Sequence, residues 1–173
     1  MHRFNRFGPA ALALAAALST CPGGADAAMP SGQTVNGIRC DPAEQVAFHI
    51  HQHLAIWNRG KPVTVPPDVG RPLLANCFYW LHTHTPDGII HVESPTFRSY
   101  TLGDFFSVWG QPLSRKEVAS AKVTPGSAMR VWVNGRPYSG NPSAIELAQH
   151  TDITIEVGPP WKPVTRFTDW QGN

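Results

Sequence analysis

A strict alternation of residue types in residues 44–57 (EQVAFHIHQHLAIW) constrains the fold of this chain more than any other feature. The even positions from 46 to 56 are apolar, with Gln52 as the one polar exception, and the odd positions from 49 to 53 are histidine. Successive side chains of a β-strand point to opposite faces, so this period is typical of a strand with one face in the core. We therefore predict a strand whose other face carries His49, His51 and His53.

Two more strands are predicted further along the chain, in residues 76–84 (NCFYWLHTH) and 89–93 (IIHVE). Residues 85–88 (TPDG) separate them and form a turn signal, because proline fixes φ and glycine accepts a positive φ. The two strands are therefore expected to form a hairpin.

The register of this hairpin decides whether its polar residues share a face. Only a register that pairs Thr85 with Ile90 buries the apolar side chains together, namely Tyr79, Leu81, Ile90 and Val92. The same register gathers four polar side chains on the opposite face: His84 opposite His91, and His82 opposite Glu93.

The remaining segments predict a mainly β chain with a short helical excursion. Thr101 opens a capping arrangement before an apolar run that stops at Gly110, and residues 114–117 (SRKE) form a capping box before a second short helix ending near Ala121. Short strands are expected near residues 62–65, 129–134 and 153–157. The expected fold class is mainly β (α+β), either an antiparallel sheet or a small β-barrel.

The N-terminal residues 1–28 have the composition of a secretory signal peptide. Arg3 and Arg6 precede a short apolar run, and residues 25–28 (ADAA) offer the small residues that signal peptidase prefers. A lipoprotein anchor at Cys21 is an alternative. We expect a periplasmic or secreted protein, with residues 29–157 as a β-rich domain and residues 158–173 as an extended tail. No apolar segment reaches the ~20 residues that span a bilayer.

Charge and motifs exclude several classes of function. With Arg3, Arg6 and Asp26 set aside, basic and acidic residues nearly balance, so the exported part lacks the basic surface expected of a nucleic-acid-binding protein. The sequence has no glycine-rich phosphate loop, serine elbow or dinucleotide fingerprint. The sequence does not identify a protein partner.

Two cysteines follow the predicted signal peptide, Cys40 and Cys77. An even pair in an oxidising compartment predicts a disulfide. Here the bridge would tie the segment before the first histidine strand to the start of the second. Thiolate coordination of a metal is the alternative interpretation, although neither cysteine belongs to a CxxC motif.

The histidines between residues 49 and 91 form a candidate metal site. The predicted ligands are His49, His51, His53, His82, His84, His91 and Glu93. Neutral imidazole suits zinc, copper, iron and nickel, and a nearby carboxylate can bind the ion or orient a histidine. With only 3 methionines in the chain, a Cu(I) carrier is disfavoured. We expect one divalent transition metal, copper or zinc, with iron and nickel as alternatives.

Other interpretations of the histidines remain open. An exposed strand face must be polar, so any one of these histidines taken alone would be interpreted as a surface residue, as His150 is. The triple alternation followed by HxH and HxE is what favours a metal. A pH-sensing histidine cluster is a further alternative.

Four segments resemble a family of small secreted bacterial proteins without an assigned activity. They are FHIHQHL at residues 48–54, CFYWLHTH at 77–84, GIIHVESP at 88–95 and TLGDFFSVWG at 101–110. The resemblance covers most of the chain after the predicted signal peptide. It implies that the histidine segments belong together, and it implies no reaction.

Three functions are compatible with these features. The first is an extracytoplasmic protein that binds a divalent transition metal through histidines on adjacent strands. The second is a small metalloenzyme, hydrolytic or redox, that uses the same cluster with Glu93 for proton transfer. The third is an interaction domain without a metal, in which exposed Trp161, Phe167 and Trp170 would recruit a partner.

Overall fold

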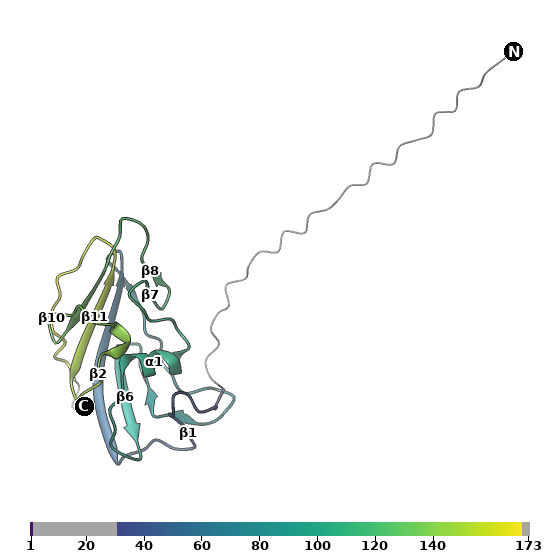
Figure 1. Cartoon of the computed structure of the whole chain (residues 1–173). Helices are drawn as coiled ribbons and strands as arrows, with labels where there is room; N and C mark the ends of the chain where they lie inside the picture. Colours follow the sequence, from purple (N-terminus) through teal and green to yellow (C-terminus); the bar gives the residue numbers. More distant parts are fainter. Residues whose placement is uncertain (2–30, 171–173) are drawn as a thin grey trace.

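The computed structural model describes Met1 and residues 31–170 of the chain (Figure 1). The predicted signal peptide, including Cys21, lies outside the described residues apart from Met1. Within residues 31–170, no helix combines the length and the apolar character needed to cross a membrane. Residues 31–170 are mainly β with one short α-helix, in agreement with the predicted fold class.

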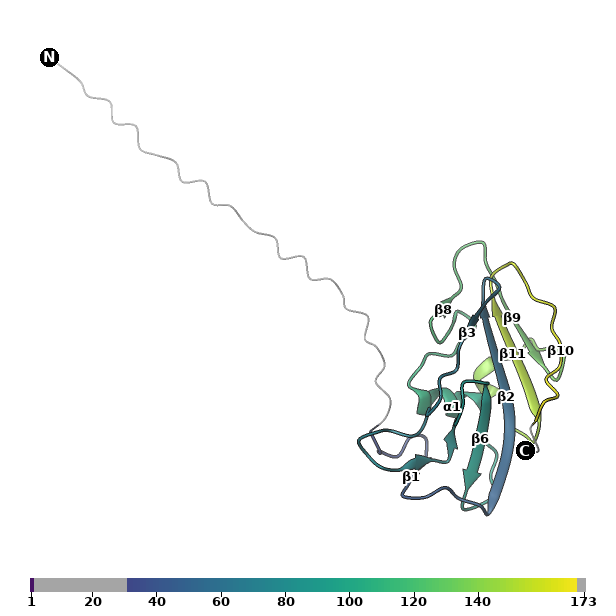
Figure 2. The same ribbon diagram turned by 180° about the vertical axis from the view of Figure 1, so that it is seen from behind.

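A seven-stranded sheet is the largest sheet within residues 31–170 (Figures 1 and 2). Its order is β10-β9-β11-β2-β6-β5, and β3 pairs with β2. The strands are β2 (Phe48–Asn58), β3 (Lys61–Val63), β5 (Leu81–His82), β6 (Ile89–Ser94), β9 (Met129–Val133), β10 (Arg136–Pro137) and β11 (Thr151–Val157). All pairs are antiparallel except β11 with β2. The sheet is open, so the small barrel, one of the two predicted architectures, is wrong.

Short elements complete the fold. Strand β1 (Cys40–Asp41) pairs with β4 (Phe78–Tyr79), and β7 (Glu117–Val118) pairs with β8 (Ala121–Lys122). The helical elements of residues 31–170 are α1 (Leu102–Trp109) and the 3-10 turn η1 (Pro142–Ala144).

The core lies between one face of the sheet and helix α1 (Figures 1 and 2). Leu54 of β2 and Ile153 of β11 are paired neighbours, and both side chains belong to the core. Phe105 and Phe106 of α1 are fully buried in the same cluster. Burying such aromatic side chains stabilises the fold by about 1.5–3 kcal/mol each. The opposite face of the sheet is left for polar groups.

The first histidine strand is shorter than its pattern predicts. β2 begins at Phe48, whereas the alternation starts at residue 44. Val46 lies before the strand and is 84% exposed, so its predicted place in the core is wrong. The pairing of β2 with β6 ends at Phe48 opposite Ser94, which leaves the preceding residues without a neighbouring strand.

The second histidine strand is divided, and its register differs from the prediction. Trp80 separates β4 from β5, and His82 lies opposite His91, two residues from the predicted register. Thr83 leaves β6 because its backbone exchanges hydrogen bonds with Asp68 and Val69. A shift of two residues keeps every side chain on its own face, so the predicted division into an apolar and a polar face holds.

Helix α1 follows the predicted signals. Thr101 caps its first turn, and Asp104 completes the capping box. Gly110 ends the helix with a φ of 69°, a left-handed conformation that glycine adopts without strain.

The second predicted helix is wrong. Its segment forms the hairpin β7–β8, in which Val118 pairs with Ala121. The Ser114 hydroxyl accepts a hydrogen bond from the backbone of Lys116, which makes a local turn in place of a helix cap. A helix this short gains little from its own hydrogen bonds, whereas the hairpin buries Val118 and Ala121.

The chain after β11 lies along the polar face of the sheet. The backbone N–H of Lys162 donates to Glu156, and that of Phe167 donates to Asp152. Arg130 of β9 stacks on the ring of Trp161. This tail covers the β11 side of the polar face and leaves the β6 side to the histidines.

Candidate metal centre

Three neighbouring strands, β2, β6 and β5, bring most of the predicted ligands onto one face. His51 lies opposite His91 of β6, and His82 of β5 lies opposite His91 on its other side. His49 lies opposite Glu93, two positions along the same face. Since these positions alternate with core positions, the imidazoles and the carboxylate project together from the polar face.

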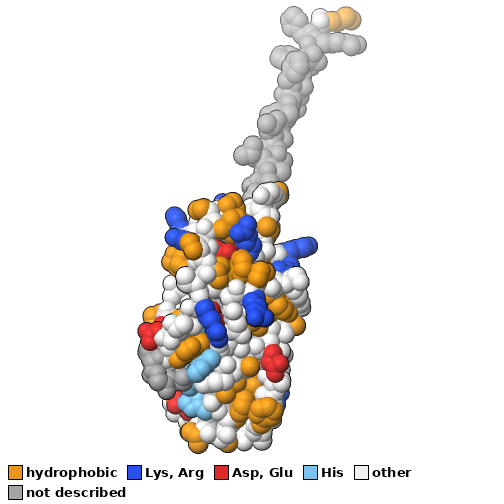
Figure 3. Space-filling view, turned by 90° about the vertical axis from the view of Figure 1, so that its left-hand side faces the viewer, with side chains coloured by type: hydrophobic (Ala, Val, Ile, Leu, Met, Phe, Trp, Pro, Cys, Tyr) orange, Lys and Arg blue, Asp and Glu red, His pale blue; other side chains and the backbone are white. Residues whose placement is uncertain are grey.

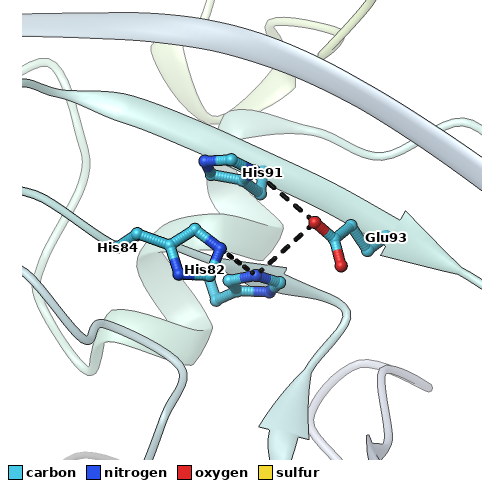
Figure 4. A group of neighbouring side chains, drawn as sticks. All are labelled: His82, His84, His91 and Glu93. Atoms are coloured by element: carbon cyan, nitrogen blue, oxygen red, sulfur yellow. Dashed lines mark hydrogen bonds and ion pairs between the residues drawn. The ribbon is translucent and has the colours of Figure 1, made fainter. Parts of the chain in front are cut away.

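One group of donors comprises His82, His84, His91 and Glu93, which point toward one another (Figure 4). His82 Nε2 lies 3.2 Å from His84 Nε2. Glu93 Oε1 lies 3.5 Å from His91 Nδ1 and 3.8 Å from His82 Nε2. One ligand atom from each residue lies within 4.8 Å of all the others. This group can hold a metal ion.

A second group comprises His49, His51 and His91. His51 Nε2 lies 2.9 Å from His49 Nε2 and 3.0 Å from His91 Nδ1. Two nitrogens bound to one tetrahedral zinc ion at 2.0–2.1 Å are separated by about 3.4 Å. The rings are thus close to the spacing that a shared ion requires.

Burial keeps the inner imidazoles of the cluster neutral. Burial, and then repulsion from His91 and His49, lowers the pKa of His51 to about 4. Burial also lowers the pKa of His82 to about 4 and shifts the pKa of His84 downward. A neutral imidazole offers a nitrogen lone pair, so these side chains need not lose a proton at pH 7 to bind a metal.

Hydrogen bonds orient the buried members of the cluster. His82 Nδ1 donates to the backbone oxygen of Tyr79 at 2.9 Å, which leaves Nε2 as the nitrogen that faces the other donors. Burial acts to raise the pKa of Glu93, but the hydrogen bond from His91 and the electrostatic interaction with neighbouring histidines outweigh it. The pKa of Glu93 therefore lies below its usual value. Glu93 is therefore a carboxylate, and it supplies the negative charge of the group.

His53 is a predicted ligand, but it lies outside both donor groups found in residues 31–170. Its Nδ1 donates to Asp152 Oδ1 at 2.9 Å, and its ring stacks on Phe167 with centroids 3.8 Å apart. Strand β11 places Asp152 directly beside His53, so this ring is held on the β11 side of β2.

Glu44 is a candidate ligand that the sequence prediction misses. Its Oε1 lies 3.5 Å from His84 Nε2 and 3.6 Å from His82 Nε2. Glu44 lies ahead of β2, where no pairing pattern ties it to the histidines. Its place directly before the histidine alternation is the one signal that could have drawn attention to it.

The predicted disulfide between Cys40 and Cys77 is confirmed. Cys40 begins β1, and Cys77 directly precedes β4, the strand that pairs with β1. Next to the bridge, the indole N–H of Trp80 donates to Asp41 at 2.8 Å. The bridged sulfurs leave no thiolate from these two residues for a metal.

The aromatic residues of the tail are half-buried, not exposed as the sequence prediction holds. Phe167 stacks on His53, and Trp170 stacks on His150 with centroids 4.4 Å apart. Trp161 lies under the guanidinium of Arg130. These rings therefore pack within the molecule.

At the rim of the cluster, the side chains of His49 and His84 are partly exposed to solvent. Figure 3 shows one face of the molecule, on which some histidine side chains reach the surface. Comparisons with models of protein families, with curated proteins and with solved structures find no match to this chain. The chemistry of the site therefore rests on its own geometry, which is that of buried His/Glu groups on adjacent strands that can hold a metal ion.

Proposed function

We propose that this protein binds a divalent transition metal outside the cytoplasm, through His82, His84, His91 and Glu93. The observation that carries the proposal is the convergence of three imidazoles and one carboxylate, with ligand atoms within 4.8 Å of one another. Two of the four residues are buried, so their positions are fixed by packing before an ion arrives.

The donor set favours copper(II) or zinc. Imidazole nitrogen is a borderline ligand that both ions bind strongly, and three histidines with one carboxylate satisfy four-coordinate zinc. Iron and nickel also accept imidazole. The disulfide and the predicted signal peptide support an oxidising compartment outside the cytoplasm, where such an ion would be captured or passed on.

A metalloenzyme is a second candidate, and the position of Glu44 favours it. Its carboxylate lies within 3.6 Å of two ligand nitrogens and is partly exposed, so it could take a proton from a metal-bound water. Azide binding to the copper(II) form, monitored by visible absorption spectroscopy, would reveal the open coordination position that this activity requires.

The test of metal binding uses the untagged, exported protein. Elemental analysis after gel filtration should find a stoichiometric transition metal. The variant His91→Ala removes a donor common to both groups. Loss of an outer hydrogen-bond partner of a ligand weakens metal binding about 10–100-fold, and loss of the ligand itself should weaken it more. His150→Ala, outside both groups, serves as the matched control.

Two results would overturn the proposal. One is a purified protein that neither carries nor takes up copper or zinc. The other is a His91→Ala variant that folds, by circular dichroism, and retains the wild-type affinity.

A further inference from the structure

The cluster contains more donors than one ion can use. Two groups are present, and together they comprise His49, His51, His82, His84, His91 and Glu93. Zinc in proteins takes four ligands in most sites, and Glu44 adds another oxygen next to the His82–His84 pair. A single ion would leave at least two of these side chains without a role.

The strand order explains how the excess arises. β6 lies between β2 and β5, so a residue of β6 has a neighbour on each side. His91 faces His51 on one side and His82 on the other. Adjacent strands are about 4.8 Å apart, and β2 and β5 lie two such spacings apart because β6 runs between them. The His49–His51 pair is therefore too far from the His82–His84 pair for all four rings to surround one ion closely.

The two β6 side chains, His91 and Glu93, lie between the His49–His51 pair and the His82–His84 pair. His91 Nδ1 lies 3.0 Å from His51 Nε2, and the ring of His91 stacks on the ring of His82 with centroids 5.5 Å apart. Glu93 Oε1 lies 3.0 Å from His49 Nε2 and 3.8 Å from His82 Nε2. An imidazole that has lost its ring N–H proton offers two nitrogens as ligands, and a carboxylate has two oxygens, so each can serve two ions.

We propose that the centre binds two divalent transition-metal ions, one held by His82 and His84 and the other by His49 and His51, with His91 shared between them. This inference rests on the proposed function and extends it to a second site. Glu93 lies between the ions and neutralises part of their charge. When both ions bind through its two nitrogens, the His91 ring releases its N–H proton to solvent. No redox step is implied.

Counting ions tests the second site. Untagged protein saturated with zinc and freed of excess metal should carry two ions per chain by elemental analysis. His51→Ala and His84→Ala should each reduce this count to one. His49→Ala provides a second variant of the β2 pair, and because the side chain of His49 is exposed, the substitution removes no core packing. His150→Ala should keep both ions.

Electron paramagnetic resonance of the copper(II) form gives an independent measurement. Two copper ions that share the imidazole of His91 couple magnetically, so the wild-type signal should be weaker than two isolated ions would give. In His49→Ala and His51→Ala, the remaining ion should give a full, uncoupled signal.

The outcomes separate this inference from the proposed function. One ion in the wild type, unchanged in His49→Ala and His51→Ala, would overturn the second site and leave the first intact. One ion that is lost in both His51→Ala and His84→Ala would also overturn it, because a single centre would then use both pairs. No ion in the wild type would overturn both proposals.

Discussion

Burial separates His51 and His82 from the other histidines in residues 31–170. Both side chains are almost inaccessible to solvent, and both have a pKa near 4 because burial disfavours the imidazolium. Neighbouring histidines add to this effect, since two imidazoliums so close together would repel each other. His51 and His82, held neutral in this way, are ready for a metal but sensitive to acid.

The metal-free protein should therefore lose stability as the pH falls. In the unfolded chain these histidines titrate near 6.5, whereas in the folded chain they titrate near 4. Between these values the unfolded chain binds protons that the folded chain does not, so the free energy of unfolding is complete above about pH 6.5 and decreases toward pH 4. At about pH 5 we expect a loss on the order of 2 kcal/mol for each histidine.

Urea unfolding of the metal-free protein at about pH 7.5 and about pH 5 measures this loss. His51→Gln removes the titrating group at position 51 and should lose less stability between the same pH values. An equal loss in His51→Gln and in the wild type would contradict the assignment to His51.

Among the elements, helix α1 depends on its first turn. It has only 8 residues, and its apolar side chains fill the space over the sheet. The hydroxyl of Thr101 accepts the N–H of Asp104, while the carboxylate of Asp104 accepts the N–H of Thr101. These bonds satisfy backbone donors that a helix otherwise leaves unpaired.

Removing this cap should cost about 1 kcal/mol. In Thr101→Ala, the helix loses the hydroxyl acceptor, and chemical unfolding should show the decrease. Thr101→Ser keeps the hydroxyl and should retain most of the stability. If the two variants were equally unstable, the loss would come from the methyl group of Thr101 and not from the cap.

Elements that depend on local patterns could be predicted, and those that depend on distant partners could not. The alternation places His49 and His51 on one face of β2, because the period of a strand is a local property. The hairpin register is off by two residues because Thr83 bonds to Asp68 and Val69, a pairing that no sequence pattern marks. His53 leaves the cluster because of Asp152, a neighbour brought in by the distant strand β11.

At the scale of the whole molecule, the disulfide joins two segments that lie 37 residues apart in sequence. β2 and β3 lie within the loop that it closes. The bridge also anchors the segment that leads from β1 to Glu44, next to the His82–His84 pair. Stability and site geometry are therefore linked through Cys40 and Cys77.

Replacing both cysteines should destabilise the fold substantially. For a loop of this length, the entropy of the unfolded chain gives a loss of about 4 kcal/mol in Cys40→Ser/Cys77→Ser. Thermal or urea unfolding in the absence of reductant measures it. A double variant as stable as the wild type would show that the unfolded chain gains little freedom when the bridge is absent.

The donors of the cluster are graded in their contact with water. The side chains of His49, Glu44 and His84 are 41%, 38% and 34% exposed, whereas those of His91, Glu93 and His82 are 14%, 6% and 0% exposed. A hydrated ion arriving from solution would meet the outer donors first and exchange its waters for protein ligands one at a time. The same rim would let a competing chelator or a recipient protein begin to withdraw the ion without unfolding the sheet, so exchange should be rapid even where affinity is high.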